Sequence, residues 1–254
     1  MSVSDRVLHQ FRFSHFNEKA RWALDHKGLP HRRRSYLPGM HVMPMLWRSG
    51  QKQLPVLCED GSAVVGSAAI IDHLERLCPD PPLYPAEPGQ RRRALELQRW
   101  FDAEIGAPIR AAGFHDWLGD GTFMAAIFAG WKGPVVHGLY RAAFPLLRRV
   151  MRADMGLTAA AAADGLVRTA QALDLVGREA GPDGYLVGDR FSVADLTAAA
   201  ILAPTVMPAA FPYPLPRPYP EVFEGWLARW RGHPGTAWVQ DMYARHRGTS
   251  RERP

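Results

Sequence analysis

A serine and an asparagine stand near the start of the chain, where an apolar stretch gives way to an amphipathic one. Residues 7 to 11 predict a strand and residues 16 to 27 a helix, so Ser14 falls on the turn between them. A helix N-terminus offers free N–H groups and roughly half a positive charge. The Ser14 hydroxyl or the Asn17 amide would add a donor for an anion. Ser14 would equally serve as a plain N-cap.

A second set of residues with chemical potential lies further along the chain. Pro55 stands at the head of the apolar run Leu54 to Cys58, a position where a strand tolerates proline. We expect the Leu54–Pro55 bond to be cis, which costs only about 0.5 to 1 kcal/mol at an X–Pro peptide. Ser67, directly after Gly66, opens a predicted helix whose first N–H groups could hold a carboxylate.

These pieces occur in a fixed order: Ser14-His15-Phe16-Asn17-Glu18, then Gln53-Leu54-Pro55-Val56-Leu57, then Gly66-Ser67-Ala68-Ala69-Ile70. Together they resemble the thioredoxin-like, glutathione-binding domain of the glutathione S-transferase superfamily. The resemblance covers most of the chain. It is specific at residues 8 to 85 and 185 to 199, and loose at residues 105 to 160.

The sharpest signal in the second half is Phe191-Ser192-Val193-Ala194-Asp195-Leu196. Ser192 can cap a helix while Asp195 reaches back to the cap's own N–H, and Phe191 with Leu196 forms a hydrophobic staple. We interpret this motif as a stability device and not as chemistry. It resembles the capping motif at the buried central helix of the same family's second domain.

The resemblance implies glutathione as co-substrate, and its thiol acts as a nucleophile only as the thiolate. Lowering the thiol pKa by about two units requires roughly 2.7 kcal/mol of differential stabilisation. Ser14 occupies the position where the family places its activating serine or reactive cysteine, with Asn17 as the alternative donor. Because position 14 is not cysteine, thiol–disulfide exchange would lack its protein nucleophile.

The same resemblance assigns residues to the binding of glutathione. A cis Pro55 would turn the Leu54 backbone towards the groove, where it would exchange strand-like hydrogen bonds with the cysteinyl unit. Lys52 and Gln53 would reach the peptide and its glycine carboxylate. His41 corresponds loosely to a basic family position near that carboxylate.

Gly66 departs from the family pattern. The γ-glutamyl carboxylate is expected at the helix that begins with Ser67. The family usually has an acidic residue directly before this serine, and it pairs with the γ-glutamyl ammonium. Gly66 cannot do this, which favours a second hypothesis: a non-catalytic binding or interaction protein that has kept the fold.

The order of elements predicts two domains. Residues 1–84 should form an α/β thioredoxin-like domain, with a hairpin turn at residues 59 to 62 and an irregular loop, possibly with a helical turn, at residues 38 to 50. Residues 85–90 are the linker. Residues 91–254 should form an all-α helical bundle, in which the proline-rich segment 204–220 runs extended.

An aromatic stretch in the second half has two interpretations. Its glycines should interrupt regular helix, so it could form the mobile wall of a cleft for an apolar electrophile. Aromatic residues at this density are more often core. The residues are Phe114, Trp117, Phe123, Phe128, Trp131 and Tyr140.

Composition excludes several other classes. The net charge of +6 comes from separated arginine clusters without interleaved aromatic residues, which makes nucleic acid an unlikely partner. No run of about 18 apolar residues predicts a spanning helix, so we expect no membrane partner. No metal-ligand spacing occurs among the ten histidines and two cysteines, so we expect no metal.

The resemblance therefore implies a glutathione S-transferase-like enzyme. We expect it to be cytoplasmic, because no apolar signal segment follows Asp5 and Arg6. It would conjugate or reduce a small apolar electrophile with glutathione. The resemblance also implies a homodimer. The alternative remains the non-catalytic binding protein.

Overall fold

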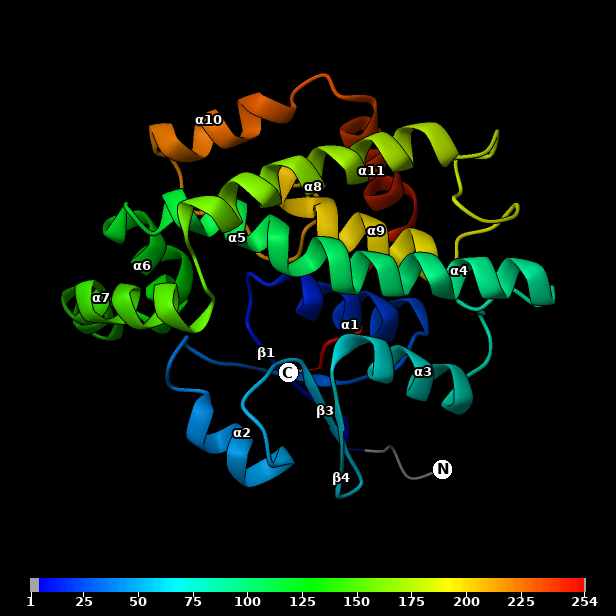
Figure 1. Ribbon diagram of the computed structural model, residues 1–254. Coiled ribbons are helices and arrows are strands. Elements are labelled where there is room, and N and C mark those ends of the chain that lie inside the picture. Colours follow the sequence, from blue (N-terminus) through cyan, green and yellow to red (C-terminus); the bar gives the residue numbers. More distant parts are fainter. Residues whose placement is uncertain (1–4, 254) are drawn as a thin grey trace.

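The computed structural model describes residues 5–253 and has a small sheet below a larger helical region (Figure 1). The sheet has the order β2-β1-β3-β4, in which β1 and β2 are parallel and the other pairs are antiparallel. Its strands are β1 (Val7–Gln10), β2 (Arg32–Ser35), β3 (Val56–Glu59) and β4 (Ser62–Val65). The expected α/β thioredoxin-like arrangement is confirmed.

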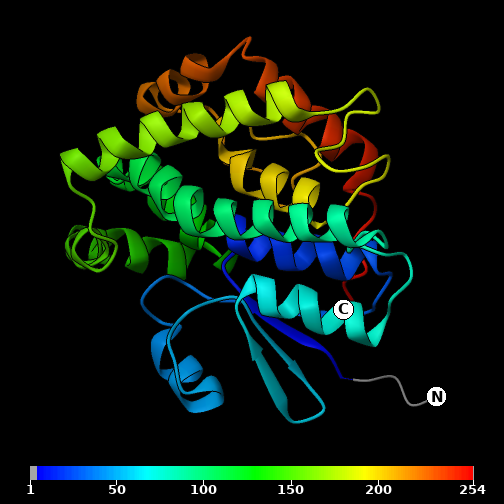
Figure 2. The same ribbon diagram turned by 45° about the vertical axis from the view of Figure 1, so that its right-hand side comes forward.

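Helix α1 (His15–His26) connects the two parallel strands and lies between the sheet and the helical region in both views (Figures 1 and 2). Its body is buried because it packs on two sides. Helix α3 (Ser67–Leu77) contacts one side and α9 (Val193–Leu202) the other. Leu8 and Leu57, paired across β1 and β3, are fully buried in the same core.

The expected loop at residues 38 to 50 was wrong in its main part, because it contains α2 (Val42–Ser49). Pro44 obscured this helix in the sequence. It lies in the first turn, where backbone N–H groups have no intrahelical acceptor, so proline is tolerated. Gly50 ends the helix in the left-handed conformation, with φ of 70°.

The helical region surrounds α9, whose residues are all buried. Its remaining helices are α4 (Pro88–Trp100), α5 (Gly106–Trp117), α6 (Gly121–Ala129), α7 (Pro134–Asp154), α8 (Ala159–Glu179), α10 (Glu221–Trp230) and α11 (Pro234–His246). Short 3-10 turns stand at Gly130–Lys132 and Ala203–Thr205. The predicted all-helical second part is confirmed, and no helix among residues 5–253 is both long and apolar enough to cross a membrane.

The capping motif folds as predicted. The Asp195 carboxylate accepts from the Ser192 backbone N–H at 2.9 Å and from the Leu186 N–H at 2.8 Å, while Ser192 caps the helix start. Burial raises the pKa of Asp195 to about 6. Phe191 stacks on Trp22 of α1, so the start of α9 is fixed against the first domain.

Helices α4 and α5 continue one another through a π-helical segment, Phe101–Ile105. Gly106 follows it at the point where α5 meets α1. A Cβ at Gly106 would stand 2.3 Å from Cζ of Phe16, so any other residue here would displace this ring. The close contact fixes the start of α1, and with it Ser14, against the helical region.

The glycine-rich stretch after α5 is more regular than expected, since it forms α6 and α7. Within it, Phe123, Phe128 and Tyr140 are buried in the core, and Trp131 is half-buried. The core interpretation therefore holds for these three rings. The glycines at 130 and 133 only separate the two helices.

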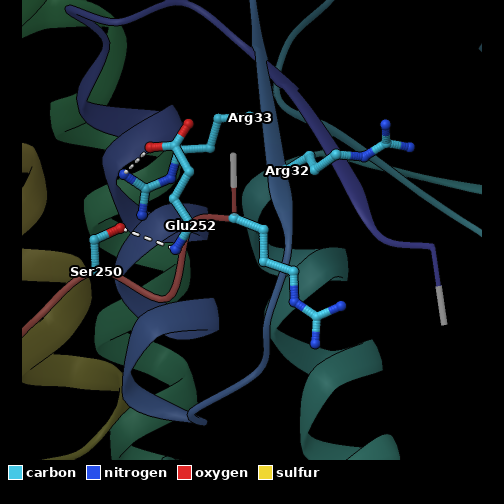
Figure 3. A pocket seen from close by; sticks show the side chains of 5 residues that line it. Arg32, Arg33, Ser250 and Glu252 are labelled. Atoms are coloured by element: carbon cyan, nitrogen blue, oxygen red, sulfur yellow. Dashed lines mark hydrogen bonds and ion pairs between the residues drawn. The ribbon is translucent and has the colours of Figure 1, made fainter. Parts of the chain in front are cut away.

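The last two irregular segments return to the first domain. In the proline-rich segment, the Tyr213 hydroxyl accepts from the Gln10 side chain at 2.6 Å. After α11, the C-terminal tail bridges the edge of β2, where the Arg253 N–H donates to the His31 carbonyl at 2.8 Å. The tail and β2 border an open depression lined by Arg32, Arg33, Ser250, Glu252 and Arg253 (Figure 3). None of the predicted site residues lines it.

Candidate glutathione site

Ser14 is the N-cap of α1 and is half-buried. Its Oγ accepts a hydrogen bond from the Asn17 backbone N–H at 3.4 Å. Because only the oxygen takes part in this contact, the hydroxyl hydrogen remains available to donate. Ser14 is therefore an N-cap, and this contact leaves its hydroxyl free for the donor role that the sequence also predicts.

Asn17 is fully buried one turn further along. Its Oδ1 accepts from the Phe11 backbone N–H at 3.3 Å, which ties the turn to the helix. Its Nδ2 is buried without a hydrogen-bond partner among the described residues. Buried polar groups normally have a partner, so this donor is one that a ligand could satisfy.

Pro55 and the start of α3 lie together. The Leu54–Pro55 bond is cis, as predicted. The Pro55 carbonyl accepts from the Gly66 N–H at 2.9 Å, which joins the β3 entrance to the helix start. Pro55 is buried and Leu54 half-buried. Two of the three sequence pieces are thus joined by a backbone hydrogen bond.

Gly66 has a backbone conformation that favours glycine, with φ of 89° and ψ of 144°. A Cβ there would meet no atom within 4 Å, so space is available although the backbone would be strained. The next residue, Ser67, is the buried first residue of α3. No side chain caps this helix start and no acidic residue stands in its first turn, so its N–H groups can receive a carboxylate.

Lys52 and Gln53 are both exposed. Lys52 forms an ion pair with Asp154 at the end of α7, and so it spans from the first domain to the helical region. The Gln53 backbone is held by Gln51, whose amide donates to the Gln53 carbonyl at 3.1 Å. The Gln53 N–H donates back to the same side chain.

His41 directly precedes α2 and is half-buried. Its ring meets Phe11 edge-on, with 4.6 Å between ring centroids, and its Nδ1 has no partner in residues 5–253. Burial lowers its pKa, and nearby Lys52 adds to this against the opposing effect of Asp154. His41 is thus a neutral hydrogen-bonding group at neutral pH and not a fixed cation.

Residues 8–82 match the family model of the glutathione S-transferase N-terminal domain. The fold of nearly the whole chain is shared with a glutathione S-transferase from Rhodospirillum rubrum (21% identity, TM-score 0.63, covering 95% of this chain and 89% of that one). Residues 8–82 are thus a glutathione S-transferase N-terminal domain, and the chain as a whole has the glutathione S-transferase fold.

Two other solved structures share the fold over most of the chain. A beta-etherase from a Sphingobium strain has 20% identity and a TM-score of 0.63, with 94% of this chain and 95% of that one covered. A glutathione S-transferase from Methylobacterium radiotolerans, solved with glutathione sulfonate, has 22% identity and a TM-score of 0.57, with 96% and 92% covered. At these identities the likeness concerns the fold. No curated protein matches the chain in sequence.

Two arginines near the start of α1 were missed in the sequence analysis. Arg12, in the turn before α1, lies over the rings of Trp131 at 5.1 Å and Tyr213 at 4.3 Å. Its Nε is buried without a partner, and no carboxylate lies within ion-pair distance of it among residues 5–253. Burial lowers its pKa. Because the rings come from distant parts of the chain, no local pattern marks this site.

Arg110 is the second such arginine and projects from α5. It is half-buried, and its Nε also lacks a partner in the described chain. Arg110 lies close enough to His15 to lower its pKa. Burial, followed by the charge of Arg110, lowers the pKa of His15 to about 3. Arg12 and Arg110 therefore place two positive charges near the start of α1 that have no ion pair among residues 5–253.

No group of three or more histidine, cysteine or acidic side chains within residues 5–253 has the arrangement to hold a metal ion. Cys58 and Cys78 are free thiols in separate settings, and burial raises the pKa of Cys58. The groups near Ser14 are therefore hydrogen-bond donors and cations, which suits an anionic organic ligand.

Proposed function

We propose that this protein binds glutathione and uses its thiolate to conjugate or reduce a small apolar electrophile. The supporting observation is the combination of a half-buried hydroxyl at the N-terminus of α1 with the joined cis-Pro55 and Gly66 backbone. When bound, glutathione supplies a sulfur nucleophile that donates an electron pair to the electrophile. The remaining steps depend on this chain's own residues.

Ser14 would donate its hydroxyl hydrogen to the sulfur and so favour the thiolate. A hydrogen bond to a charged group contributes about 1.5 to 3 kcal/mol. The α1 terminus adds about 0.3 to 1 kcal/mol. Their sum covers the roughly 2.7 kcal/mol needed to lower a thiol pKa by two units. Asn17, through its unpartnered Nδ2, is the alternative donor.

The charged ends of the tripeptide would meet different elements. The γ-glutamyl carboxylate fits the free N–H groups at the start of α3, beside Ser67. Lys52, Gln53 and the neutral His41 would bind the glycine carboxylate. The unpaired Arg12 adds a cation that the sequence did not assign to the site.

A non-catalytic binding protein is the second candidate, and one observation favours it. Gly66 provides no carboxylate for the γ-glutamyl ammonium, and Lys52 is already paired with Asp154. Both features would weaken glutathione binding. In that case the fold would serve recognition without turnover.

We also propose cytoplasmic function and a two-fold homodimer. Support for the dimer comes from the superfamily fold and from the frequency of isologous dimers among oligomeric proteins. Sedimentation velocity over a range of protein concentrations would test it. A single monomeric species at every concentration would contradict the dimer without affecting the chemistry.

Calorimetric titration with glutathione tests the main proposal. Binding is expected for the wild type, with glutathione sulfonate as a non-nucleophilic comparison ligand. Turnover of a chloronitrobenzene then separates the two candidates: binding with turnover supports the enzyme, and binding without turnover supports the second candidate. Absence of heat at millimolar glutathione would refute both the enzyme and the glutathione site.

A further inference from the structure

Helix α7 carries an apolar face that the fold does not use. Val135, Leu139, Leu146 and Val150 are 73%, 69%, 66% and 58% exposed. Their spacing places them along one side of the helix. Single exposed apolar residues are ordinary, but a contiguous exposed patch marks an interaction surface.

The apolar face is distinct from the side by which α7 is attached. Tyr140 and Phe144 are buried against the core, and Leu147 and Met151 pack partly against it. These four residues recur at helical spacing on a different side of the helix. The helix is therefore anchored by one side, while the exposed face requires another partner.

Helix α2 and the turn before it carry further exposed apolar residues in the first domain. Trp47 is 82% exposed, and Met40, Met43 and Leu46 are also exposed. The loop before α2 contacts α7, because the Tyr140 hydroxyl donates to the Pro38 carbonyl at 3.3 Å. Both views place α2 and α7 on the same side of the molecule (Figures 1 and 2). We call the exposed apolar residues of both helices the α2–α7 surface.

The charges on α7 are nearly all positive. Arg141, Arg149 and Arg152 are exposed along the helix, and Lys132 is exposed just before it. The exposed carboxylate of Asp154 is already paired with Lys52. A second copy of this surface would bring arginines towards arginines without free carboxylates to pair them. The surface therefore calls for a partner that is both apolar and anionic.

We propose that the α2–α7 surface binds the anionic face of a phospholipid bilayer. An amphipathic helix of this kind lies in the interface, with its apolar side among the acyl chains and its arginines at the headgroups. Exposed tryptophan is suited to the same depth. This differs from our expectation of no membrane partner, which concerned spanning helices. The proposal is independent of glutathione chemistry.

Co-sedimentation of the full chain with vesicles tests the proposal. Vesicles of phosphatidylcholine alone are compared with vesicles that also contain phosphatidylglycerol. Binding is expected only with the anionic lipid, and high salt should weaken it, because each interfacial Lys or Arg contributes about 1 kcal/mol, or roughly fivefold. Wild-type protein that stays in solution with anionic vesicles at low salt would overturn the proposal.

Two comparisons between variants locate the surface. Leu139→Gln with Leu146→Gln should lower vesicle binding at least about tenfold. Val167→Gln, at an exposed apolar position of α8, should not. Arg141→Gln with Arg149→Gln should lower binding more than Arg92→Gln with Arg99→Gln, which changes the net charge equally on α4.

The controls also decide between alternatives. Equal losses for the α7 and α4 arginine pairs would show general attraction of a basic protein and refute a defined surface. A dimer that the Leu139 and Leu146 substitutions convert to monomer would show that a second copy covers the surface, and would likewise refute the proposal. All substituted side chains are exposed, so circular dichroism should show an unchanged fold.

Discussion

Two parts of α1 differ in how their buried polar groups are paired. We call the part that contacts the C-terminal tail the paired side, and the N-terminal turn the unpaired side. Along the helix, Glu18 and Asp25 are matched by arginines: Arg247 donates to Glu18 at 2.5 Å and to Asp25 at 2.9 Å, and Arg21 donates to Glu18 at 2.7 Å. At the N-terminal turn, Arg12, His15 and Asn17 each keep a buried nitrogen without a partner in the described chain. Arg21 and Arg247 also keep one buried Nη2 without a partner, but both are ion-paired with Glu18, whereas Arg12 and His15 have no ion pair among residues 5–253.

This difference suggests that one part of α1 stabilises the fold and that the other part binds a ligand. An unsatisfied buried donor costs about 1 to 3 kcal/mol, so a fold retains several of them in one place only at a cost. The paired side holds the C-terminal tail against the first domain. The unpaired side is where we propose that a ligand completes the hydrogen bonds.

The largest effect is expected on the paired side. Arg247→Ala would remove one buried ion-pair partner from each of two carboxylates, leaving Glu18 with Arg21 and Asp25 with Arg33, and should lower the free energy of unfolding by up to about 3 kcal/mol. Chemical denaturation measures this. Arg229→Ala, at an exposed position of α10, is the control and should change stability by less than about 0.5 kcal/mol. Similar small losses for both would show that the buried pairs are not stabilising.

The sequence predicts the residues that follow local rules, but it does not predict the contacts of the arginines. Ser14, Pro55 and Ser67 are marked by local rules for turns, strands and helix starts, and the structure places them in those elements. The partners of Arg12 and Arg247 are set by tertiary packing. Trp131, Tyr213 and Glu18 lie far from them in the sequence, so no periodicity or spacing connects them.

On the unpaired side, Ser14→Ala should reduce turnover about 10- to 100-fold, which corresponds to one donor contributing about 1.4 to 2.7 kcal/mol in the transition state. Loss of the cap should also cost about 1 kcal/mol of stability. Turnover must therefore be measured where the variant is fully folded. Ser192→Ala, which removes the cap of α9, controls for capping alone. If the folded Ser14 variant keeps parental turnover, Asn17 or the backbone N–H groups hold the thiolate.

Arg12→Met should weaken glutathione binding roughly tenfold, the loss expected for one charged hydrogen bond of about 1.4 kcal/mol. Its effect on stability should be below that of Arg247→Ala, since Arg12 has no ion pair among residues 5–253 and stacks only on aromatic rings. Calorimetry measures the affinity for glutathione, and chemical denaturation measures the free energy of unfolding. A large loss of stability with unchanged affinity would assign Arg12 to the docking of the proline-rich segment.

The smallest effect concerns the pH dependence of stability at His15. Burial, and then Arg110, lower its pKa in the folded protein to about 3, below the ordinary value of 6.5. The unfolded chain therefore binds a proton first as the pH falls. The contribution of neutral His15 is complete above pH 6.5 and is lost progressively as the pH falls towards 3.

Removing the charge of Arg110 should raise the pKa of His15 and reduce this loss, although burial would still hold the pKa below its ordinary value. Titration of the His15 ring by NMR in wild type and Arg110→Met measures the shift directly. Arg141→Met on exposed α7 is the matched control, because it removes the same charge from another surface. An equal shift in both variants would mean that His15 responds to net charge. A shift confined to Arg110→Met would place an unpaired arginine next to the start of α1, where the proposed thiolate site lies.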